Sequence, residues 1–133
     1  MYMANKGDLL KVTIAILFSL FPCIFTTTAY SAHLHPEKWY QDKWCAENKG
    51  QSEVMLPDKT RADCITKTNV IEFDFAHKFY EAIGQSLYYS LQTGKKAGIV
   101  LIIENPGDRK YWIRLNSTIQ HFSLPIDTWV VGE

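Results

Sequence analysis

An alternation of apolar and acidic residues, followed at once by a helical pattern, limits what this 133-residue chain can fold into. In the segment 70–75, Glu72 and Asp74 are two residues apart, so they leave the same face of a strand while the apolar residues leave the other. From Ala76 the apolar period becomes that of a helix. Two carboxylates on one strand face are costly unless water, a cation or hydrogen-bond donors meet them. The pattern therefore predicts a strand that carries a polar site and leads into a helix.

The predicted helix has two neighbouring stripes of side chains. Its apolar stripe has four-residue steps and consists of Phe79, Ile83, Leu87 and Leu91. Its polar stripe consists of Lys78, Glu81, Gln85 and Tyr89. Because the polar stripe adjoins the edge expected to be buried, long polar side chains are expected near the acids of the preceding strand.

A third acid, Asp63, lies on the strand predicted at 61–66, which a turn at 68–69 joins to the strand with Glu72. Asp63 and Glu72 meet across the two strands if the turn sets that register. Neighbouring carboxylates repel each other, and a divalent cation with oxygen ligands relieves the repulsion. The alternative is that Glu72 and Asp74 lie on a solvated face of the sheet.

Other acids are candidates to join these three. Glu53 is on the strand predicted before Asp63 and is the preferred addition. Glu37 and Glu47, on a helix predicted at the start of the domain, remain alternatives to it.

The order Asp63, then Glu72-x-Asp74, then Gln85-x-x-x-Tyr89 resembles the PD-(D/E)xK nuclease superfamily. It is most similar to the branch with the Q-x-x-x-Y helix motif, which includes RecB-type and phage exonucleases. The resemblance covers about residues 36–131. It departs from the superfamily at position 74, where a Lys is usual and this chain has Asp.

The resemblance implies a Mg²⁺ or Mn²⁺ site in which Asp63 and Glu72 are metal ligands and Gln85 lies beside them. Lys78 is expected to supply the amine that position 74 lacks. The implied catalytic set is Asp63, Glu72, Asp74, Lys78 and Gln85. The implied metal ligands are Asp63 and Glu72, with Glu53 as the preferred third.

The order of predicted elements agrees with the α/β fold that the resemblance implies, a restriction-endonuclease-like αβββαβ core with a mixed central sheet and flanking helices. A continuous aliphatic run at 99–103 predicts a buried strand. The expected elements are a helix at 36–48, strands at 53–57, 61–66 and 70–75, a helix from 76 to 91, a strand at 99–103, a helix at 111–122 and a strand at 126–131 that pairs in parallel with the aliphatic one.

The first 32 residues have a different composition and are predicted to be a secretory signal peptide, followed by one domain at 33–133. Lys6 and Lys11 precede an apolar run at 12–25, and small residues follow it. A run of this length is short for a membrane span, which needs roughly 20 residues. Cleavage after Ser31 or Ala32 predicts a periplasmic or secreted protein with no stable membrane insertion; the alternative is an uncleaved anchor.

The domain that remains after such cleavage carries 12 basic and 13 acidic side chains. This near-neutral charge does not favour tight, non-specific binding of long duplex nucleic acid. Its two cysteines, Cys45 and Cys64, are compatible with one disulfide in an exported protein and equally with buried free thiols.

Two hypotheses of function follow. The first is an exported, metal-dependent nuclease that hydrolyses phosphodiester bonds of nucleic acid, DNA in particular. The second is an inactive protein of the same fold that serves as an extracytoplasmic binding or effector module. Asp74, in place of the usual Lys, favours the second.

Overall fold

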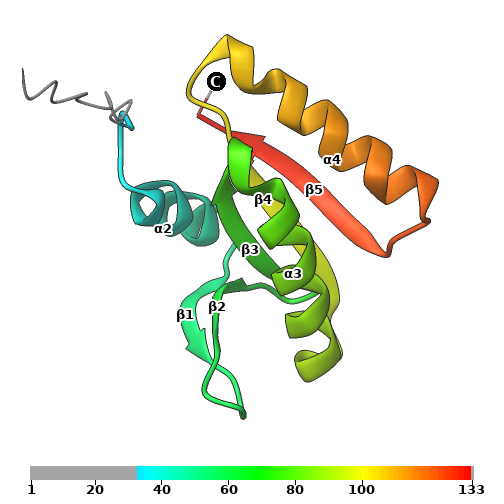
Figure 1. Cartoon of the computed structure of the whole chain (residues 1–133). Helices are drawn as coiled ribbons and strands as arrows, with labels where there is room; N and C mark the ends of the chain where they lie inside the picture. The colour runs from blue at the N-terminus through cyan, green and yellow to red at the C-terminus, as the bar shows by residue number, and fades with distance from the viewer. Residues whose placement is uncertain (1–32, 133) are drawn as a thin grey trace, which may run out of the picture. The chain divides into compact units, whose positions relative to one another are not determined.

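A computed structural model describes residues 33–132 of the chain (Figure 1). The predicted signal peptide at 1–32 lies outside the described residues, so the export of the protein stays a prediction. Between residues 33 and 132, no helix has both the length and the apolar character required to cross a bilayer.

The predicted elements are all present, and the ends of all but the last strand differ from the expected ones by one to three residues. The first strand begins and ends two residues earlier than expected, because the backbone N–H of Leu56 already donates to the carbonyl of Thr60 in the following turn. The elements are α2 (Glu37–Glu47), β1 (Gln51–Met55), β2 (Arg61–Ile65), β3 (Asn69–Phe75), the 3₁₀-helix η1 (Ala76–Lys78), α3 (Phe79–Thr93), β4 (Lys96–Ile102), the 3₁₀-helix η2 (Pro106–Asp108), α4 (Arg109–His121) and β5 (Ile126–Val131).

The five strands form one mixed sheet in the order β1-β2-β3-β4-β5. The first three strands are antiparallel to one another, whereas β3, β4 and β5 are parallel. The prediction of an α/β fold with a mixed sheet is confirmed, as is the parallel pairing of the last strand. Each parallel crossover contains one helix, α3 or α4, as a connection of this kind requires.

Helices cover both faces of the sheet around β3 (Figure 1). On one face, Trp44 and Cys45 of α2 pack with Ile71 and Phe73. On the other face, α3 and α4 cover β4. As a result, all seven residues of β3 are buried. The alternative of a solvated face for the acids of this strand is therefore wrong.

The buried side of α3 differs from the predicted stripe at its far end. Phe79 is buried, as expected, but Leu91 is 79% exposed and Tyr89 is only 7% exposed. Four-residue steps advance about 40° beyond a full helical turn, so Leu91 lies about 120° around the helix from Phe79. The residues that actually face the sheet are spaced by three or four: Phe79, Ala82, Ser86 and Tyr89.

A disulfide between Cys45 and Cys64 ties the end of α2 to β2, with 5.9 Å between the two Cα atoms. The alternative of free thiols is therefore wrong. Both cysteines are fully buried, and Gly50 lies directly against them. A Cβ atom at Gly50 would lie 2.5 Å from one sulfur and 2.7 Å from the other, so a residue with a side chain there would displace the disulfide.

Candidate functional site

Asp63 and Glu72 lie side by side on neighbouring strands. The register pairs Cys64 of β2 with Ile71 of β3, and one further step brings Asp63 opposite Glu72. The Phe73 backbone N–H donates to Asp63 Oδ2 over 2.8 Å. Burial and the neighbouring Asp63 charge raise the pKa of Glu72, so the arrangement favours a proton on the Glu72 carboxyl group. The structure thus brings together the two acids that the sequence placed on facing strands.

Asp74 follows Glu72 by two residues on the same face of β3, and its neighbour is Lys78. The Lys78 Nζ is 3.7 Å from Asp74 Oδ1, which is an ion pair but too long for a hydrogen bond. Burial raises the pKa of Asp74 to about 7, although Lys78 acts to lower it. Lys78 therefore reaches Asp74 rather than Glu72, and it does not compensate for the burial of this acid.

Glu72 and Asp74 each have one carboxylate oxygen that lacks any hydrogen-bond partner. These oxygens are Glu72 Oε2 and Asp74 Oδ1, and the residues that carry them are only 6% and 4% exposed. Leaving a buried polar atom without a partner costs roughly 1–3 kcal/mol, and more when the group is charged. Such atoms point to a missing partner, which can be a proton, a water molecule or a cation.

The electrostatics of the cluster favour protonated carboxyl groups. The pKa of Glu72 is raised first by burial and then by the charges of Asp63, Asp74 and Glu37. Burial likewise raises the pKa of Asp63, although the hydrogen bond from Phe73 acts to lower it. The acids therefore hold protons that a bound cation would displace.

Glu53, the preferred third ligand, lies beside Asp63, but both of its carboxylate oxygens already have partners. Gln41 Nε2 donates to Glu53 Oε1 and to the Asp63 carbonyl, each over 2.7 Å. Arg61 Nε is 2.6 Å from Glu53 Oε2. Glu53 has a backbone φ of +56°, a left-handed conformation that is strained for a residue in a strand. This strain positions the Glu53 carboxylate between Gln41 and Arg61, so binding a metal ion would require it to release one of them.

Glu37, which the sequence left as an alternative third ligand, is more available to a metal ion than Glu53. It is the first residue of α2 and is half-buried. Its pKa is raised by burial and then by the charge of Asp63. Gln41, which the sequence analysis missed, follows Glu37 by one helical turn, and this i, i+4 spacing is the signal that would have identified the side of α2 facing the acids. Glu47 faces a different part of the surface.

Gln85 and Tyr89 contact each other on α3. The Tyr89 hydroxyl donates to Gln85 Oε1 over 3.1 Å. The Tyr89 ring packs against Val70 of β3, and its pKa is raised to about 12 by burial and by the charges of Glu72 and Asp63. Tyr89 therefore lies near the acids, and its hydroxyl is hydrogen-bonded to the Gln85 amide oxygen.

No group of three His, Cys, Asp or Glu side chains within the described part of the chain is already arranged as a metal centre. Comparison of the chain with protein-family models, curated proteins and solved structures gives no match.

Proposed function

We propose that this protein is a divalent-metal-dependent phosphodiesterase that hydrolyses nucleic acid, with DNA as the favoured substrate. The observation that carries the proposal is a group of three carboxyl side chains on neighbouring strands: Asp63 is half-buried, and Glu72 and Asp74 are buried and each have one oxygen without a hydrogen-bond partner. Lys78 is the one cation that contacts them among residues 33–132. A small divalent cation with oxygen ligands would neutralise their repulsion and use the unpaired oxygens.

The arrangement of the elements supports the same proposal. The order of a helix, three antiparallel strands, a helix and a strand parallel to the third is compatible with the αβββαβ core of the restriction-endonuclease-like fold that the sequence resemblance implies. In the proposed assignment α4 and β5 are additions at the edge beyond β4. The acids lie on β2 and β3, the strands on which that resemblance expects them.

Each residue has a proposed task in the hydrolysis. Asp63 and Glu72 hold the cation, and Glu37 approaches it from α2. A bound Mg²⁺ or Mn²⁺ supplies charge for the scissile phosphate and a lower pKa for its water. Lys78, paired with Asp74, places its ammonium beside the site and stabilises negative charge that develops on the phosphate. Gln85, oriented by Tyr89, positions the attacking water by hydrogen bonding.

The second candidate is an inactive protein of the same fold, and one observation favours it. Asp74 occupies the position of the usual Lys, and its side chain holds the Lys78 ammonium by an ion pair. In either case we propose that the protein acts outside the cytoplasm. The Cys45–Cys64 disulfide supports a location outside the cytoplasm, because disulfides persist mainly in oxidising compartments.

The test is cleavage of plasmid and of single-stranded DNA by the full-length chain with Mg²⁺, with Mn²⁺ and with a chelator. Metal-dependent cleavage that Asp63→Ala abolishes would support the phosphodiesterase. A wild-type protein that binds Mn²⁺ but cleaves nothing, and that gains activity on Asp74→Lys, would show that the inactive module is the better description. Cleavage that persists in the chelator would contradict the metal assignment.

A further inference from the structure

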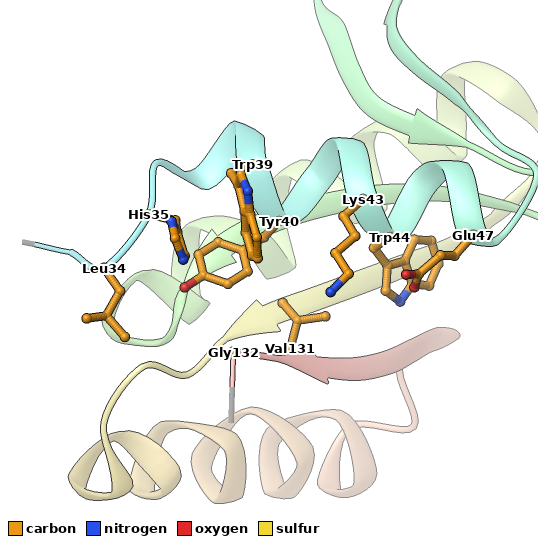
Figure 2. A pocket seen from close by; sticks show the side chains of 9 residues that line it. All are labelled: Leu34, His35, Trp39, Tyr40, Lys43, Trp44, Glu47, Val131 and Gly132. Atoms are coloured by element: carbon orange, nitrogen blue, oxygen red, sulfur yellow. The ribbon is translucent and has the colours of Figure 1, made fainter.

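A hollow of about 410 Å³ opens between α2 and the end of β5 (Figure 2). Its size falls within the range of roughly 300–1,000 Å³ that is usual for small-molecule sites. The carboxylates Asp63, Glu72 and Asp74 do not line it. It is therefore a separate feature, which the proposed hydrolysis does not use.

Aromatic rings form the walls of this hollow. Tyr40 and Trp44 line it from α2, and Trp39 stands at its edge with 45% of its surface exposed. The imidazole of His35 is stacked on the Trp39 ring, with 4.0 Å between centroids. Tyr40 is only 5% exposed, so Trp39 is the most accessible of these rings. Stacking on aromatic side chains contributes free energy for every kind of base.

Two opposite charges also line the hollow, one helical turn apart on α2. Figure 2 shows Lys43 extending from the helix toward Val131, with Glu47 beside Trp44. Both side chains are exposed, and within residues 33–132 neither forms an ion pair or a side-chain hydrogen bond. The Lys43 ammonium lies 5.4 Å from the centroid of the Trp39 ring. The hollow therefore presents a free donor and a free acceptor next to its aromatic walls.

We infer that this hollow binds a nucleobase and prefers guanine. The guanine edge presents two N–H donors next to a carbonyl acceptor. The Glu47 carboxylate can accept from the two donors while the Lys43 ammonium donates to the carbonyl, and donation by Lys to this carbonyl is a usual contact of guanine. Adenine has an unprotonated ring nitrogen where guanine has its ring N–H, so it would place an acceptor against the carboxylate. This inference needs no metal ion and goes beyond the proposed hydrolysis.

The experiment measures binding of GMP, AMP, CMP and UMP to the full-length chain by saturation-transfer NMR and tryptophan fluorescence, with a chelator present. Because no metal is required, a failure here is independent of a failure of the carboxylate site. GMP is expected to bind about fivefold or more tightly than AMP, the lower range for one well-placed bidentate contact. A single-stranded oligonucleotide with one guanine, compared with GMP, distinguishes a base within a strand from a free nucleotide; tighter binding of either one supports the inference.

Matched variants test the geometry. Glu47→Gln should remove the preference for GMP over AMP, and Trp39→Ala should weaken binding of all four nucleotides. The controls are Asp42→Asn, an exposed acid of α2 outside the hollow, and Tyr80→Ala, an aromatic residue that is 71% exposed on α3. Both controls should bind like the wild type. Absence of nucleotide binding, an unchanged preference in Glu47→Gln, or self-association through the hollow that nucleotides do not affect would overturn the inference.

Discussion

Without divalent cations, the free energy of unfolding should fall as the pH rises from about 5 to about 8. Asp74 determines the direction of this pH dependence. Its pKa is about 7 in the folded protein, against 3.8 for a free Asp side chain, so the folded state holds the proton more tightly than the unfolded chain. Between these values the unfolded state binds fewer protons, and stability is lost as the pH rises. Asp63 and Glu72, whose pKa values are also raised, act in the same direction.

The size of the effect follows from the shift of Asp74 alone. A rise of about three pKa units at about 1.4 kcal/mol each gives ~4 kcal/mol, and we expect ~2 kcal/mol because the exposed Lys78 and nearby water relieve part of the cost. For a domain of this size, that corresponds to a fall in Tm of roughly 10 °C. Acids with lowered pKa values, such as Glu104 and Asp127, lose their protons at lower pH in both states and do not contribute to this window.

The assay is thermal unfolding of the full-length chain, followed by circular dichroism across this pH range with a chelator present. Asp74→Asn should give a flatter pH profile and a higher Tm near pH 8, whereas the exposed Asp42→Asn should follow the wild type. Excess Mn²⁺ should raise the wild-type Tm most at the alkaline end, because fewer protons compete there with the cation for the carboxylates. A Tm that is constant or rises from pH 5 to pH 8 in the chelator would refute the reasoning.

Three further outcomes are expected. Lys78→Met keeps most of the side-chain length without the charge. It should lower the cleavage rate roughly a hundredfold or more with little change in Tm. Cleavage at the wild-type rate would mean that another group supplies the positive charge assigned to Lys78. Replacing Cys45 and Cys64 together by Ala should lower the free energy of unfolding by about 3 kcal/mol, as expected for a disulfide between residues 19 positions apart. An unchanged denaturation midpoint would contradict a stabilising role of the disulfide. Glu104→Gln should lower the free energy of unfolding by about 1–2 kcal/mol, because the buried carboxylate accepts hydrogen bonds from the backbone at 34–35 and from Tyr40. Chemical denaturation measures this loss. A loss equal to that of an exposed Glu→Gln change would contradict the prediction.

Much of the fold was predictable because its central strand has an unambiguous pattern. The alternation around Glu72 fixed which side chains share a face, and the aliphatic run at 99–103 predicted a buried parallel strand. Neither depends on distant contacts. The prediction for Leu91 was wrong because four-residue steps rotate away from the sheet along a helix of fifteen residues.

The surroundings of the acids were harder to predict. Whether Glu53 or Glu37 is available depends on their partners, and the hydrogen bonds of Gln41 come from a helix that is distant in sequence from the acid strands. The hollow beside Lys43 and Glu47 also requires the packing of α2 against β5, which no local pattern shows. Sequence spacing identifies residues that share a face, but it does not identify what covers that face.

The central claim is that Asp63 and Glu72 bind a divalent cation, and calorimetric titration of the full-length chain with Mn²⁺ near neutral pH tests it most directly. One site is expected, with heats that differ between buffers of different ionisation enthalpy because the carboxyl groups release protons on binding. Asp63→Ala and Glu72→Ala should each abolish this binding while the thermal transition of the domain is retained. Mn²⁺ affinity that is unchanged in both variants, or a wild-type protein that binds no Mn²⁺, would contradict the account.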